Sequence, residues 1–227
     1  MSTNRIRLWD LPTRLFHWSL VLCIVASFIS GQLGGNMIVW HGRIGLFIVG
    51  LITFRLVWGF IGSTYARFAQ FFPSPAKLKA YLRGEWRGVG HNPLGAFSVF
   101  GLIGLIGLQV ATGLCSNDDI AFVGPLYDLI DKSLSNSLSA IHELVSNVLI
   151  ALVVMHIGAV IFHGRVKKDD LVKPMLTGHK EVSEGESARG GGLIAFVFAV
   201  IVACGVTYTA SGIWVDQPPP PAATPSW

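Results

Sequence analysis

The sequence predicts an all-α membrane protein with five transmembrane helices, the last of them near the C-terminus. Of its 227 residues 52% are hydrophobic and only 13% are charged, whereas soluble domains average about 25% charged residues. The mean hydropathy is +0.57, and the apolar residues gather in five runs, each near the roughly 20 residues that cross a bilayer. The net charge of +4 lies in loops beside these runs, so it indicates membrane orientation rather than nucleic-acid binding.

The five predicted spans are separated by loops of opposite charge. In chain order they are Leu15–Leu33, Val39–Ile61, Leu94–Leu114, Leu138–Phe162 and Leu193–Trp214. Basic residues concentrate before the first span and in the loops 62–93 and 163–192, whereas the loop 115–137 carries four aspartates and one lysine. The positive-inside rule therefore places the N-terminus and both basic loops in the cytoplasm. Tryptophans, including Trp58, fall near the span ends, as expected of an interfacial aromatic belt.

The chain divides into three predicted regions. Residues 1–180 are expected to form the main transmembrane domain, 181–214 a linker with the fifth transmembrane helix, and 215–227 a Pro-rich periplasmic tail. Within the first basic loop, Lys77–Trp86 has helical spacing and is either a helix on the membrane surface or a solvated loop. The three cysteines show no CxxC spacing, so a disulfide framework is not expected.

Four histidines lie inside the predicted spans: His17, His41, His142 and His156. The last two are fourteen residues apart, which returns them to within about 40° of one helix face and separates them by about 21 Å. A single histidine near a helix end is usually an interfacial, hydrogen-bonded residue. The predicted topology, however, sorts these four by depth, with His17 and His156 near the cytoplasmic face and His41 and His142 near the outer face. Ionisable residues at such depth indicate a functional site.

Two histidine pairs at two depths suit two six-coordinate metals. Haem iron accepts one axial nitrogen on each face, so the bundle is expected to enclose two haems b, held by His17/His156 and His41/His142. Coordination with no open position favours electron transfer over oxygen binding. Two other classes of protein stay open, a transmembrane transition-metal transporter and a passive membrane anchor.

Several cationic and polar residues accompany the histidines. Arg14, Arg43 and Arg55 are predicted to bind haem propionates, with snorkelling to the headgroups as the alternative. His163 is expected either to assist a propionate or a quinone, or to be an interfacial residue. In the motif before the third span, Asn92 and Pro93 have the residue types of a helix start, and His91 either belongs to that cap or serves a haem or quinone. His179 is expected to be solvated.

The motifs at these positions resemble one family. They are RLWDLPTRLFHW at 7–18, WHG at 40–42, GHNPLG at 90–95, and IHE at 141–143 with MH at 155–156. Over about residues 5–180 they resemble bacterial di-haem cytochrome b561, in particular the cytochrome b subunit of nickel–iron hydrogenases. The resemblance implies a bacterial inner-membrane protein in which a four-helix transmembrane bundle encloses two b haems on His17, His41, His142 and His156, with the fifth, C-terminal transmembrane helix added to that bundle. It also implies exchange of electrons between quinone or quinol and a redox partner.

The predicted function is transmembrane electron transfer between the quinone pool and a periplasmic partner, either a c-type cytochrome or a hydrogenase-like enzyme. The acidic loop around 118–131 suits a basic partner surface. On the same fold, a superoxide-to-quinone oxidoreductase is the alternative. No catalytic residue is assigned, so the chain is expected to be an electron-transfer protein, with quinone-linked oxidoreductase activity left open.

Overall fold

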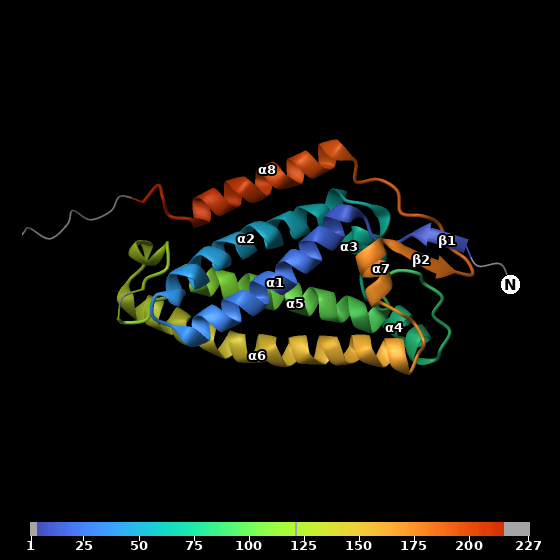
Figure 1. Ribbon diagram of the computed structural model, residues 1–227, viewed down its shortest axis with the longest axis horizontal. Coiled ribbons are helices and arrows are strands. Elements are labelled where there is room, and N and C mark those ends of the chain that lie inside the picture. The colour runs from blue at the N-terminus through green and yellow to red at the C-terminus, as the bar shows by residue number, and fades with distance from the viewer. Residues whose placement is uncertain (1–3, 121, 216–227) are drawn as a thin grey trace, which may run out of the picture.

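The computed structural model describes residues 4–120 and 122–215, and its five long helices confirm the predicted spans (Figure 1). Each is long and apolar enough to cross a membrane. Their bounds are α1 Leu11–Leu33, α2 Met37–Ile61, α5 Pro93–Gly113, α6 Lys132–Arg165 and α8 Leu193–Ala210.

Four of these helices form the bundle and the fifth lies outside it. Helix α1 packs on α2, α5 packs on α6, and α2 also contacts α5 and α8. In Figure 1, α8 runs along α2 at one edge of the molecule and α6 lies at the opposite edge. The buried core takes side chains from every long helix, including Phe16, Leu20, Ile48, Ile52, Ile106, Leu149 and Ala199. The predicted four-helix bundle with an added helix is therefore confirmed.

Several helices begin or end at other residues than predicted, because capping side chains extend them or a glycine stops them. Helix α1 begins at Leu11 because the Asp10 carboxylate caps it, accepting a hydrogen bond from the Thr13 backbone N–H at 2.7 Å. Helix α6 begins at Lys132, capped by Asp131, and its 34 residues span about 51 Å, well beyond a hydrocarbon core of about 30 Å. Hydropathy misses these first polar turns. Helix α8 stops at Ala210, since Gly212 adopts a φ of +66° that leaves the helix.

The two ends of the bundle carry different short elements. At one end, here called the sheet end, strand β1 (Asn4–Arg7) pairs antiparallel with β2 (His179–Val182). The same end carries η1 (Thr64–Ala66), α3 (Phe68–Phe71), α4 (Pro75–Leu82) and α7 (Val172–Thr177) (Figure 1). At the other, the loop end, residues 114–120 and 122–131 connect α5 to α6 and include η2 (Tyr127–Leu129). The sheet was not predicted, because strands of four residues leave no readable alternation.

Three sequence expectations concern the loop 62–93, the domain boundary at residue 180 and the tail. Of the two alternatives for Lys77–Trp86, a helix or a solvated loop, the structure contains a helix, α4, which starts earlier, capped by Ser74, and stops at Leu82. Strand β2 crosses residue 180, where the bundle domain was expected to end, and the next segment also returns to β1, since the Ala188 N–H donates to the Arg7 carbonyl at 2.7 Å. The Pro-rich tail, from residue 216 onward, lies outside the described residues.

Trp58 joins the sheet end to the bundle instead of belonging to an interfacial belt. It is only 2% exposed, and its indole N–H donates to the Asp10 carboxylate at 3.0 Å. One carboxylate oxygen thus caps α1 while the other satisfies a buried indole on α2.

Replacing Asp10 with alanine should destabilise the fold. The change removes an N-cap, worth about 0.5–2 kcal/mol, and leaves a buried N–H unsatisfied, at about 1–3 kcal/mol. We expect a total loss of about 2 kcal/mol or more in the free energy of unfolding, measurable as a lower thermal midpoint in detergent. Asp10→Asn keeps one acceptor oxygen for the cap but turns an NH2 donor toward the Trp58 N–H, so it should recover only part of the loss. A wild-type thermal midpoint in the alanine variant would contradict this account.

Candidate functional site

The loop end brings two of the predicted histidines together. The ring centroids of His41 on α2 and His142 on α6 lie 6.0 Å apart, with the planes at 79° to each other. Metal–imidazole bonds of about 2 Å on either side of one metal place two rings at a comparable separation. The pair expected from depth alone is therefore adjacent in the structure.

Hydrogen bonds orient both imidazoles in the same way. The Nδ1 atom of His41 lies 2.8 Å from the Ser27 carbonyl oxygen, and that of His142 lies 2.9 Å from the Gln109 carbonyl oxygen. A carbonyl oxygen can only accept, so Nδ1 carries the proton in each ring and Nε2 keeps its lone pair. This is the tautomer of histidines that bind metals through Nε2.

Glycines make room for these rings. A Cβ atom on Gly31 of α1 would lie 3.1 Å from Nδ1 of His41, and one on Gly113 of α5 would lie 2.9 Å from Cε1 of His142. Gly45, one turn after His41 on α2, has open space beside it. Glycine thus allows each imidazole to pack directly against a neighbouring helix.

The Gln109 side chain contributes a polar group that the sequence analysis missed. Its amide nitrogen lies 3.0 Å from Nε2 of His142, and donation to that nitrogen agrees with the tautomer deduced above. Its amide oxygen is buried without a hydrogen-bond partner among the described residues. An amide inside an apolar run is itself a sequence signal, because such groups are costly in a membrane.

The second predicted pair lies toward the sheet end. No ring contact joins His17 on α1 to His156 on α6 among the described residues, and the His17 ring instead meets Trp18 edge to face, with ring centroids 5.1 Å apart. The Nδ1 atom of His156 faces the Ser98 hydroxyl at 3.4 Å, whereas Nδ1 of His17 is buried without a partner in the described part of the chain. This pair is less fully supported by hydrogen bonds than the loop-end pair.

Arg55 is a buried cation at the sheet end. Its side chain is 3% exposed and lies over the Phe68 ring at 4.7 Å. Its Nη1 atom is buried and has no hydrogen-bond partner within the described residues. Because a buried N–H group without an acceptor is costly, this nitrogen suits an anionic group such as a carboxylate, in addition to the nearby charge of Asp10.

The remaining candidates have other contacts. Arg14 donates to the Leu176 carbonyl of α7, although its Nε atom is buried without a partner in the described chain. Arg43 is exposed and stacks over Trp40 at 5.0 Å, which matches the snorkelling alternative. His163 faces the hydroxyl of Tyr81 on α4 at 3.4 Å. None of these contacts assigns a cofactor role.

His91 lies at the sheet end, between aromatic rings. Its ring centroid is 4.8 Å from that of Trp9 and 4.5 Å from that of Phe71. The helix cap of α5 is supplied by Asn92, whose side chain accepts from the Gly95 N–H at 2.7 Å, and not by His91. A cavity of about 270 Å³ lies beside it, with Tyr65, Gln70, Lys77 and Trp86 also in its lining.

His91 should make stability depend on pH. Burial is the main cause that lowers the pKa of His91 to about 3, whereas an unfolded histidine has a pKa of about 6.5. Smaller contributions come from Arg55 and then from His156 and His17. Between about pH 3 and 6.5 the unfolded chain binds the additional proton, so stability falls as the pH is lowered through this range.

From pH 7 to pH 5, His91 should therefore account for a loss of about 2 kcal/mol. Thermal unfolding in detergent at both pH values, compared between the wild type and His91→Phe, measures this share. The phenylalanine ring keeps the aromatic packing, so the variant should lose less stability on acidification. Equal losses in both proteins would rule out His91 as the source.

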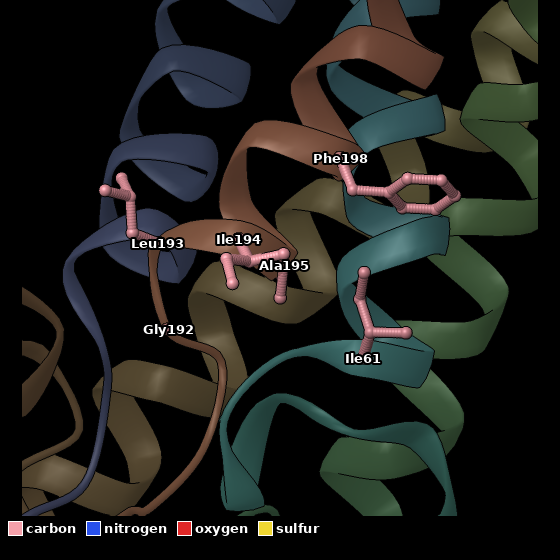
Figure 2. Close-up of a pocket in the computed structure, with 6 residues that line it drawn as sticks. All are labelled: Ile61, Gly192, Leu193, Ile194, Ala195 and Phe198. Carbon is pink, nitrogen blue, oxygen red and sulfur yellow. The ribbon is translucent and has the colours of Figure 1, made fainter.

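A separate cavity of about 700 Å³ lies where α2 ends and α8 begins. Figure 2 shows its lining, with Ile61 from α2 and Gly192, Leu193, Ile194, Ala195 and Phe198 at the start of α8. These side chains are all apolar and include none of the histidines. The cavity therefore offers no group for metal or redox chemistry.

Comparison with known proteins shows which family the chain belongs to. Residues 8–178 match the family model of prokaryotic cytochrome b561. The "Probable Ni/Fe-hydrogenase 1 B-type cytochrome subunit" of Escherichia coli strain K12 is 19% identical, covering 78% of this chain and 92% of its own. The corresponding protein named for Cupriavidus necator is 22% identical over 79% and 88%, and that of Azotobacter vinelandii is 26% identical over 42% and 52%. No solved structure matches the chain. The chain therefore belongs to the prokaryotic cytochrome b561 family and is a multi-pass, b-type cytochrome of the membrane.

Proposed function

We propose that this cytochrome holds two haems b and carries electrons across the inner membrane between the quinone pool and a periplasmic redox partner. The observation that carries the proposal is the loop-end pair. His41 and His142 lie with ring centroids 6.0 Å apart, and both keep Nε2 free of a proton. Two such nitrogens are the axial donors of a six-coordinate haem.

The residues of the chain fit two such groups. Helix α6 contributes one histidine to each pair, His142 and His156, fourteen positions apart, which separates them by about 21 Å along the helix. Arg55 supplies a buried, unpaired guanidinium nitrogen for a propionate. The side-chain amide of Gln109 would have to turn away from His142 for Nε2 to bind iron. When bound, haem b supplies a one-electron iron couple.

The partner proposal rests on the relatives and on charge. The related proteins are named as B-type cytochrome subunits of Ni/Fe-hydrogenases, which supports a hydrogenase-like partner. The loop end carries four aspartates, of which Asp119 pairs with Lys132 at 2.9 Å. This acidic surface also suits a c-type cytochrome with a basic face.

The quinone proposal rests on the sheet end. The cavity of about 270 Å³ beside His91 combines aromatic walls with the polar side chains of Gln70 and Lys77. Small pockets with apolar walls and a few polar groups are typical of ligand sites. The basic residues of the loops at this end support a cytoplasmic position for it and for the N-terminus.

The arrangement favours haem over a transported metal ion. Structural zinc takes four protein ligands and catalytic zinc three. Among residues 4–120 and 122–215, no group of three or more His, Cys, Asp or Glu side chains gathers in such a way. Paired imidazoles therefore suit haem better than a bare transition metal.

Haem stoichiometry tests the proposal. Pyridine haemochromogen analysis of the purified protein should give two haems b per chain. In proteoliposomes, quinol on one side should then reduce an impermeant acceptor on the other. A chain that binds one haem or none, or that fails to pass electrons across the membrane, would contradict the proposal; no haem at all would revive the transporter and the anchor.

A further inference from the structure

One turn of α5 packs against the ring of His142, although α5 supplies none of the four paired histidines. The turn is Gln109–Gly113. Nδ1 of His142 lies 2.9 Å from the Gln109 carbonyl oxygen and 3.3 Å from the Thr112 hydroxyl oxygen. Gly113 leaves the space that the ring needs.

The Thr112 hydroxyl is placed to accept and not to donate at this nitrogen. Its own proton has two acceptors one turn back, the Leu108 carbonyl at 2.9 Å and the Gln109 carbonyl at 3.0 Å. Because Nδ1 of His142 carries a proton, an oxygen lone pair of Thr112 faces an N–H group. The Nδ1–H group of His142 therefore has two acceptors, a carbonyl and a hydroxyl.

No other member of the two pairs has a comparable set among the described residues. Nδ1 of His41 has the Ser27 carbonyl alone, Nδ1 of His156 faces only a hydroxyl at 3.4 Å, and Nδ1 of His17 is buried without a partner. Thr112 itself is 3% exposed, so water does not compete with its contact. In such surroundings hydrogen bonds act more strongly than in water.

We propose that Thr112 is a positioning residue that adds a second acceptor at the Nδ1–H group of His142 and thereby lowers the reduction potential of the loop-end haem. This rests on the proposed function, in which His142 is an axial ligand. An acceptor at Nδ1–H makes the imidazole a stronger electron donor through Nε2. A stronger donor stabilises oxidised iron relative to reduced iron, so removing the acceptor raises the potential of that haem.

The test is a redox titration of the intact protein with the two haems resolved spectroscopically. The loop-end couple is identified as the one lost in His142→Ala. In Thr112→Val this couple should shift to a more positive potential, by about a tenfold change in its reduced-to-oxidised ratio, or 59 mV for one electron. The other couple should stay in place.

Two variants separate the hydroxyl from other effects. Thr112→Ser keeps the hydroxyl and should titrate like the wild type. Thr207→Val is the matched control, because Thr207 also bonds to a carbonyl one turn back, at 2.8 Å, but lies on α8; it should shift neither couple. If the valine variant fails to retain the loop-end haem, Thr112→Ala provides the same measurement with a smaller side chain.

The two proposals fail differently. A wild-type protein with fewer than two haems contradicts the proposed function before any titration. With two haems present, unshifted potentials in Thr112→Val and Thr112→Ala would overturn the role of Thr112 alone. An equal positive shift in Thr112→Ser would also overturn it, because the methyl group and not the hydroxyl would then be responsible.

Discussion

Replacing His142 with alanine should reduce the haem content from two per chain to one. The imidazole is the only one that α6 places beside His41, at 6.0 Å between ring centroids, so the loop-end haem would lose an axial ligand. The sheet-end histidines lie about four helical turns away and should keep their haem. Pyridine haemochromogen analysis measures the stoichiometry, and the reduced-minus-oxidised spectrum shows which haem remains.

His156→Ala is the reciprocal variant and should remove the other haem. Its spectrum should then complement that of His142→Ala. His179→Ala serves as the control, because His179 lies on β2, where its Nδ1 contacts the Thr177 carbonyl at 3.0 Å; it should retain both haems. Two haems in both His142→Ala and His156→Ala would disprove the ligand assignment.

Adding a single methyl group at Gly113 should also weaken the loop-end haem. In Gly113→Ala the new Cβ would lie 2.9 Å from Cε1 of His142, so the ring must move. Overpacking of this kind costs about 1–3 kcal/mol, and a displaced ligand shell typically costs about 10–100-fold in metal affinity. Haem loss to apomyoglobin, followed by absorbance, measures the change.

Gly104→Ala provides the matched control on the same helix. A Cβ there meets nothing within 4 Å, so haem retention should stay at the wild-type level. Equal haem loss from both variants would point to α5 as a whole and not to the packing of Gly113 on His142. Wild-type retention in Gly113→Ala would show that the ring adjusts freely.

Hydropathy and charge were sufficient to predict the five helices and the pairing of His41 with His142 at one end of the bundle. Both depend on regular physical rules, the length of a bilayer-spanning helix and the position of basic loops. The proximity of His41 and His142 followed from depth alone, because two helices of one bundle present residues of equal depth to each other. Arg55 was also recognisable, since a cation inside an apolar run requires a partner.

The surroundings of the histidines could not be predicted in the same way. The contacts of His41 and His142 run to backbone carbonyls of Ser27 and Gln109, and every residue type has such a carbonyl. Gly31 and Gly113 carry no side chain that would indicate a role in the sequence, and only the structure places imidazoles against them. The β1–β2 sheet joins segments about 175 positions apart, and no local pattern in four-residue strands indicates such pairing.

The length of α6 also restricts how this chain can change over evolution. Its two paired histidines are joined by thirteen residues, 143–155, within one continuous helix. An insertion or deletion of one residue there would rotate one imidazole by about 100° relative to the other. The helix could then present a histidine to only one of the two proposed haem sites. Residues 143–155 can therefore accept substitutions but not insertions or deletions, whereas the loops at either end of α6 tolerate changes in length.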